Sequence, residues 1–76
     1  MNINQKIAKR IKELRQEHSL TAEKLAWHSG LSKSCIQYAE NAKRDIKIST
    51  IESICAGLEI SLAEFFMTFN KIKKAD

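Results

Sequence analysis

The stretch LTAEKLAWHSGLSKSCIQYAE, residues 20–40, decides the fold of this chain. Each of its halves begins with a hydroxyl residue, Thr21 or Ser32, whose side chain can accept a hydrogen bond from an unpaired N–H at a helix start. Gly30, between them, tolerates the left-handed conformation that ends many helices. We therefore predict two short helices, one that stops at Gly30 and one that runs to about Asn41, joined by a tight turn.

The apolar residues of this stretch predict how the two helices pack. Leu25 supplies the inward face of the first helix, and Ile36 with Ala39 that of the second. Ala26 is small enough to let the helices cross closely. Two helices joined by a glycine-containing turn, with a polar outer face on the second, form a helix-turn-helix, whose second helix fits the major groove of B-DNA. That outer face is then free to read base edges.

The residues before this motif predict one amphipathic helix that ends near His18. Its apolar residues recur three or four positions apart and are Ile3, Ile7, Ile11 and Leu14. Charged side chains occupy its other faces, and we interpret the basic ones as an ordinary solvated surface. These basic residues are Lys6, Lys9, Arg10 and Lys12.

The residues after the motif predict a connecting loop, at about 41–47, and two further helices. Two serine–glutamate pairs have capping-box spacing and predict the helix starts, Ser49 with Glu52 and Ser61 with Glu64. The inward residues of the fourth helix are Ile51, Ile54, Cys55 and Leu58. The broad apolar face of the fifth comprises Leu62, Phe65, Phe66 and Phe69. We expect the tail, 71–76, to fray.

Length and composition predict a single all-α domain. A chain of 76 residues is too short for two domains, so we expect one domain over 1–76 with its core at about 3–70. There is no proline and there are only two glycines, which leaves few β-turn signals. The predicted fold is a compact bundle of about five helices. Since no apolar run approaches the roughly 20 residues of a membrane span, and no signal peptide begins the chain, we expect a cytoplasmic protein without a membrane partner.

Charge and reactive residues favour binding over catalysis. The formal charge of +4 suggests a polyanionic partner without deciding the question. No catalytic triad, carboxylate pair or glycine-rich phosphate loop appears, so we expect no enzyme, no cofactor and no small-molecule ligand. Cys35 and Cys55 lack Cys-x-x-Cys spacing, and His18 and His28 stand apart, so we expect reduced thiols, surface histidines and no metal site.

These motifs and their spacing resemble the Xre/Cro-like family of phage repressors and bacterial regulators. The resemblance runs from about residue 7 to 66 without a gap. It is carried by IAKRIKELR (7–15), LTAEKLA (20–26), GLSKSCI (30–36), ENAKR (40–44), Ile51 and LEISLAEFF (58–66). Two segments look most like the small controller proteins of restriction–modification systems, which are compact dimeric activator-repressors. They are KRDIKIS (43–49) and ICAGLEISLAEFF (54–66).

The resemblance implies a lambda-repressor-like domain that binds a roughly palindromic operator in double-stranded DNA as a homodimer and regulates transcription. Lys33 and Ser34 match positions that touch base edges, and Gln37 with Tyr38 lies one turn later, where bases or phosphates are reached. The positions that match contacts to the DNA backbone are Asn41, Lys43 and Arg44, of which Arg44 also corresponds to an arginine that approaches base edges. Arg15 and Glu40 match a structural ion pair between the first helix and the reading helix.

Three departures from the family pattern accompany the resemblance. Ala22 replaces a glutamine that braces the reading helix, and Lys33 with Ser34 replaces arginine with threonine, so we carry over no target sequence. Ala42 replaces a glycine, and we expect Asn41 to take the left-handed conformation there instead.

Apolar residues beyond the motif predict a second interface. We expect Leu62 and Phe65 to face the monomer core, and we expect Trp27 to be partly buried against neighbouring helices. The residues left to pack across a two-fold axis are Phe66, Met67 and Phe69. The alternatives to a controller protein are a phage-type repressor and an antitoxin or protein-binding adaptor of the same fold.

Overall fold

The computed structural model describes residues 1–70, so the predicted fraying of 71–76 lies outside the described residues. Over 1–70 the chain is all-helical, which confirms the predicted fold class. Its elements are α1 (Ile3–Glu17), α2 (Ala22–Ser29), α3 (Lys33–Asn41), α4 (Ile48–Leu58), α5 (Leu62–Phe66) and the 3-10 turn η1 (Met67–Asn70).

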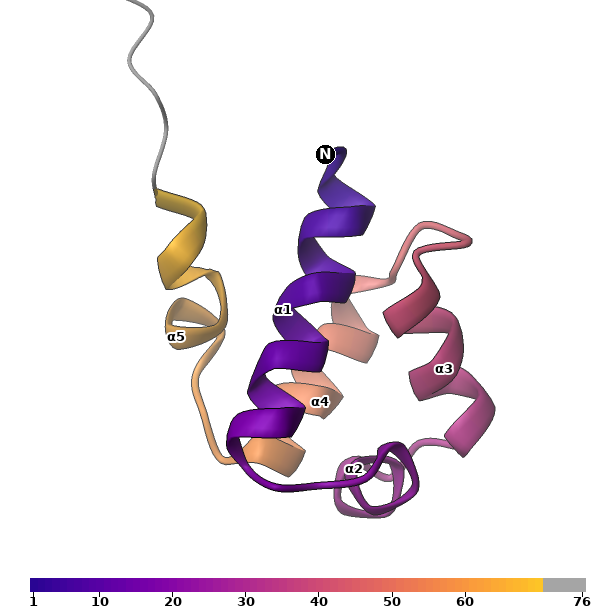
Figure 1. Cartoon of the computed structure of the whole chain (residues 1–76). Helices are drawn as coiled ribbons and strands as arrows, with labels where there is room; N and C mark the ends of the chain where they lie inside the picture. Colours follow the sequence, from indigo (N-terminus) through magenta and orange to yellow (C-terminus); the bar gives the residue numbers. More distant parts are fainter. Residues whose placement is uncertain (71–76) are drawn as a thin grey trace, which may run out of the picture.

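The helices surround one small interior. In Figure 1, α1 runs along the front of the bundle with α4 behind it, and α2 lies across the lower end and packs most extensively on α4. α3 and α5 lie on opposite sides of α1. Every α-helix contributes at least one large side chain with under 2% exposure, namely Ile11, Leu25, Ile36, Ile51, Ile54 and Phe65. Burial of each such side chain stabilises the fold by about 1.5–3 kcal/mol.

Three of the predicted helix starts are confirmed. The hydroxyls of Thr21 and Ser32 each accept a hydrogen bond of 3.1 Å from the backbone N–H three residues later. Ser61 and Glu64 form the predicted capping box, in which each side chain accepts from the other residue's backbone N–H at 3.0 and 3.2 Å. These caps set the starts of α2, α3 and α5.

The predicted capping box of Ser49 and Glu52 is wrong. α4 begins at Ile48 after Lys47, whose side chain makes no cap hydrogen bond. Ser49 lies inside the helix, where its carbonyl accepts from the Ser53 hydroxyl at 3.1 Å. Ile46 packs against the core, and the chain enters the helix at Ile48, before it reaches the serine.

The start of α1 differs from the sequence expectation. Asn2 and Gln5 form a capping box that sequence analysis did not identify. Ile3 was assigned to the apolar stripe but is 55% exposed, because the first residue of α1 lies beyond the end of the core. The buried stripe of α1 consists of Ile7, Ala8, Ile11 and Leu14.

The two turns that flank α3 both use a left-handed residue. Gly30 has φ +69°, as predicted. After α3 the left-handed residue is Ala42, with φ +55°, and not Asn41 as predicted. Asn41 remains the last helical residue of α3, so the reversal falls on the next position, where a side-chain methyl makes this conformation cost about 1–2 kcal/mol.

Arg10 was predicted to lie on a solvated face, and this prediction is wrong. Its Nε donates to the Phe65 carbonyl at 2.7 Å, and its Nη2 donates to the Glu64 carbonyl at 2.8 Å. The last carbonyls of a helix lack i+4 donors within it, and a guanidinium can donate to two of them at once; the Glu64 carbonyl also accepts from the Met67 N–H. Arg10 thereby attaches the five-residue helix α5 to α1. The other basic residues of that face, Lys6, Lys9 and Lys12, are exposed.

Two apolar residues are more exposed than predicted. Trp27 is 79% exposed on the outward face of α2, where its ring makes an edge contact with the His28 ring at 5.2 Å between ring centroids. Leu62 is 37% exposed, whereas Phe65 is fully buried as predicted. A helix of five residues can direct few side chains inward, and the large ring of Phe65 occupies that space.

Cys35 and Cys55 are free thiols. Cys55 is buried among the apolar residues of α4, and this burial raises the pKa of its thiol. The protonated form is therefore favoured, and Cys55 acts as a small apolar side chain.

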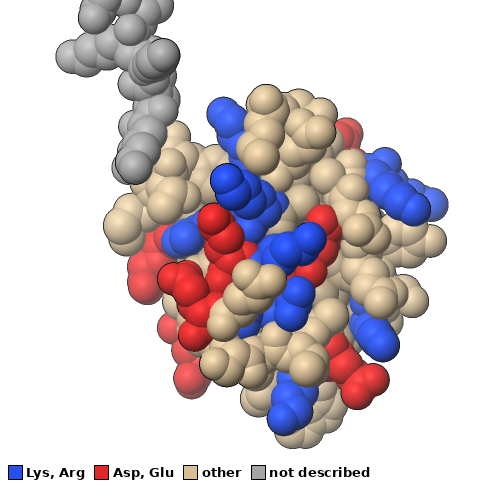
Figure 2. All heavy atoms as spheres, in the orientation of Figure 1, with Lys and Arg blue, Asp and Glu red and all other residues tan. Residues whose placement is uncertain are grey.

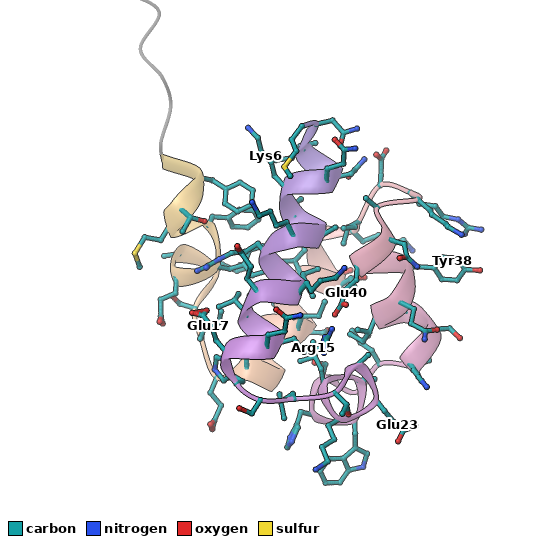
Figure 3. The ribbon with its side chains drawn as sticks, in the orientation of Figure 1. Lys6, Arg15, Glu17, Glu23, Tyr38 and Glu40 are labelled. Carbon is teal, nitrogen blue, oxygen red and sulfur yellow. The ribbon has the colours of Figure 1, made fainter. Side chains whose placement is uncertain are left out.

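Arg15 and Glu40 join α1 to the end of α3 through two parallel hydrogen bonds. Arg15 Nε lies 2.7 Å from Glu40 Oε2, and Arg15 Nη2 lies 3.1 Å from Glu40 Oε1. Arg15 Nη1 also donates to the Leu20 carbonyl at 2.9 Å, in the turn before α2. Figure 3 shows the two side chains directed toward each other between the helices. They are only 17% and 9% exposed, and the hydrogen bond to Glu40 raises the pKa of the Arg15 guanidinium.

We expect Glu40→Gln to destabilise the protein by about 2 kcal/mol, between the values for exposed and fully buried ion pairs. The neutral amide leaves a sheltered guanidinium without its counter-charge. Urea unfolding at one fixed protein concentration, followed by helical circular dichroism, measures the change. Glu13→Gln, at an exposed position of α1, is the control and should change stability by less than about 0.5 kcal/mol. A loss that small for Glu40→Gln would contradict a stabilising role for the pair.

Candidate nucleic-acid interface

α3 has a buried face and an exposed face, as the sequence predicts. Ile36 and Ala39 are 0% and 3% exposed and hold the helix against α1 and α2. The residues assigned to the outer face are all exposed, and they are Lys33, Ser34, Gln37 and Tyr38. Tyr38 is 50% exposed and points away from the bundle in Figure 3. The helix is thus fixed on one side and available to a partner on the other.

The loop between α3 and α4 extends this surface. Its candidate contact residues, Lys43 and Arg44, are exposed, as is Asn41 at the end of α3. The guanidinium carbon of Arg44 lies 5.1 Å from the centre of the Tyr38 ring. The structure therefore brings Tyr38 of the helix and Arg44 of the loop together, whereas Asn41 lines a separate hollow beside α1.

An open groove of about 390 Å³ lies between α3 and the loop. Its rim includes Ser34, Tyr38 and Arg44, which sequence analysis selected, and also Lys47 and Thr50, which it did not. Lys47 immediately precedes α4. The available signal for Lys47 was its position in the predicted loop 41–47, beside Lys43 and Arg44.

Positive charge predominates on this side. The basic residues of α3 and the loop are Lys33, Lys43, Arg44 and Lys47. Of the two carboxylates nearby in sequence, Glu40 is paired with Arg15, and Asp45 accepts a hydrogen bond of 2.7 Å from the Asn4 amide. Figure 2 shows Lys and Arg at the edge where α3 and the loop lie, whereas both signs of charge alternate over the front of α1. A protruding helix with cationic surroundings is suited to an anionic partner.

Residues on the other side of α1 form an apolar surface. Phe66 and Phe69 are half-buried and pack at 5.1 Å between ring centroids, while Met67 is 58% exposed. Phe65 lies beneath them, 4.9 Å from Phe66. Because α5 and α3 lie on opposite sides of α1 in Figure 1, a partner on this surface would leave α3 uncovered.

Residues 1–70 contain neither a metal-binding cluster nor a membrane-spanning helix. No cluster of three or more His, Cys, Asp or Glu side chains there could hold a metal ion. None of the helices in that range is both long and apolar enough to span a bilayer. The chemistry available on the α3 side is hydrogen bonding, stacking and positive charge.

Comparison with known proteins identifies relatives that share this fold. A family described as helix-turn-helix matches residues 11–65. Control protein C.MunI from Mycoplasma sp is 32% identical over 71 residues, which cover 92% of this chain and 96% of that protein. The restriction-modification controller protein C.Esp1396I bound to a 19 base pair DNA duplex has a TM-score of 0.86 and 33% identity, covering 96% of this chain and 100% of that one.

A second structure of that controller protein, a tetramer in complex with its natural 35 base-pair operator, also has a TM-score of 0.86, with 34% identity over 93% of both chains. The family match spans α2, the glycine turn and α3, together with α4. The resemblance inferred from sequence motifs is confirmed. This chain belongs to the helix-turn-helix family, as a relative of the restriction–modification controller proteins.

Proposed function

We propose that this protein is a transcriptional regulator that binds a specific, roughly palindromic sequence of double-stranded DNA as a homodimer, in the manner of a controller protein. The observation that carries the proposal is the exposed polar face of α3 beside a basic loop. It occurs in a chain that matches a DNA-bound controller protein over nearly its whole length. We further propose that 1–76 acts as one cytoplasmic DNA-binding domain without catalytic activity.

The proposed DNA-contacting surface contains residues that would contact base edges and residues that would contact phosphates. An α-helix with its side chains is about 10–12 Å wide, close to the width of the major groove. Lys33 and Ser34 lie at the start of α3, where a helix inserted by its N-terminal end meets base edges. Gln37 and Tyr38 lie one turn further. We assign the phosphate contacts to Asn41, Lys43 and Arg44, with Arg44 also able to reach base edges.

The apolar surface of α5 and η1 suits a second copy of the chain. Two reading helices about 34 Å apart meet successive major grooves on one side of the duplex. One helix contacts too few base pairs to select a site, and two linked half-sites add their free energies. We assign the dimer contact to Phe66, Met67 and Phe69.

We expect binding to be sequence-specific and to weaken steeply with salt. Lys43 and Arg44 in each subunit would neutralise four phosphates per dimer, so log Kd should change with log salt with a slope of about 4. Fluorescence anisotropy with a duplex selected from a random library measures this, and a scrambled duplex of equal composition is the control. Equal affinity for both duplexes would overturn the proposal.

Two lysines should behave differently when changed to alanine. Lys33→Ala should cost about 1–3 kcal/mol, concentrated at particular base pairs, because Lys33 is assigned to base edges. Lys43→Ala should weaken all sequences alike and lower the salt slope by about one for each subunit. Titration of both variants against a panel of single-base operator changes separates the profiles. If the two profiles coincide, Lys33 reads no base.

We expect Phe66→Glu to give a folded monomer that has lost cooperative operator binding. A buried carboxylate in the two-fold contact is unfavourable, while Phe65 and the Arg10 hydrogen bonds still hold α5 in place. Sedimentation and circular dichroism measure assembly and folding. Trp27→Glu introduces the same charge at a more exposed aromatic and should leave the dimer intact. A dimeric Phe66→Glu protein would place the interface elsewhere.

A further inference from the structure

Tyr38 and Arg44 come from different elements and meet outside the core. Tyr38 lies on α3, Arg44 lies in the loop after it, and the guanidinium carbon is 5.1 Å from the ring centre. That distance and position are those of a cation–π contact. An exposed arginine in a loop otherwise samples many rotamers, and binding must then select one of them. The ring restricts this sampling before any partner arrives.

The backbone under Tyr38 is held firmly. Its neighbours Ile36 and Ala39 are buried, and Glu40 is joined to Arg15 by two hydrogen bonds. The ring is therefore presented from a fixed part of α3. A fixed ring can position a guanidinium, whereas a mobile one could not.

The backbone under Arg44 is held from the other side. The next residue, Asp45, accepts a hydrogen bond of 2.7 Å from the Asn4 amide at the start of α1. Ile46 packs against the core. The hydrogen bond to Asn4 also engages the carboxylate adjacent in sequence to Arg44. These contacts restrain the loop on one side of Arg44, and its long side chain lies against the Tyr38 ring.

We infer that Tyr38 is a positioning residue for Arg44. It holds the guanidinium at the rim of the groove between α3 and the loop, in the orientation in which that group meets DNA. The inference rests on the proposed function and deepens it, because it assigns Tyr38 a role through Arg44 in place of a direct contact through its hydroxyl. In this role the face of the Tyr38 ring contacts the guanidinium, and the hydroxyl is not needed.

The test compares Tyr38→Phe, which keeps the ring, with Tyr38→Leu, which removes it. Tyr38→Phe should bind the selected operator within about twofold of the parent protein. Tyr38→Leu should lose about tenfold per dimer, since each subunit loses one exposed cation–π contact. In an Arg44→Ala background Tyr38→Leu should cost no further affinity. Gln37→Leu, on the same face, is the matched control, and its loss should add to that of Arg44→Ala.

A second measurement reads the contact without DNA. In the free protein, NMR should show the Arg44 side-chain protons shifted upfield by the aromatic ring in the parent and in Tyr38→Phe, and unshifted in Tyr38→Leu. Thermal unfolding checks that all three proteins fold. The inference is overturned if Tyr38→Phe loses as much affinity as Tyr38→Leu, if Tyr38→Leu loses none, or if its loss persists beside Arg44→Ala. Failure of the parent protein to prefer its operator would instead overturn the proposed function, and the NMR shift distinguishes the two cases.

Discussion

The paired hydrogen bonds between Arg15 and Glu40 are the contact on which the candidate interface depends most directly. One guanidinium joins the end of α3, through Glu40, to α1 and to the turn before α2, through the Leu20 carbonyl. The planar guanidinium of arginine can donate to two carboxylate oxygens and a carbonyl at once. The ammonium group of lysine lacks this fixed donor geometry. Together with the burial of Ile36 and Ala39, this contact holds the end of α3 and the start of the loop against α1.

Other polar residues of α1 hold α5 and the loop between α3 and α4 in place. Arg10 holds α5 through two carbonyls, and Asn4 holds the loop through Asp45. The chain is too small for a core that could fix all of these elements by apolar packing alone. Polar side chains at three levels of one long helix therefore position the reading helix, the basic loop and the apolar surface. In the proposed mode α1 is a scaffold, and its polar residues support function without touching DNA.

The sequence predicted the helices and most of the core because period and caps are local signals. Thr21, Gly30 and Ser32 act within a few residues of themselves, so their effect can be read from the chain. The errors arose where distant residues decide. Arg10 looks like one solvated cation among several until α5 brings the carbonyls of Glu64 and Phe65 beside it. The left-handed position after α3 falls on Ala42 and not on Asn41, so the preference of the residue type does not decide where this helix ends.

The candidate contact surface was found because α3 needs a buried face, and burial of Ile36 and Ala39 leaves only one orientation for its polar residues. What sequence alone could not show is how α3 and the loop act together. At its start α3 carries lysine, a flexible point charge, in place of the rigid fork of arginine. The arginine in this surface lies instead in the loop, beside the ring of Tyr38. On the proposed mode of binding, directional recognition therefore shifts from the start of the reading helix toward the loop, and the ring that orients Arg44 contributes to which sequence is preferred.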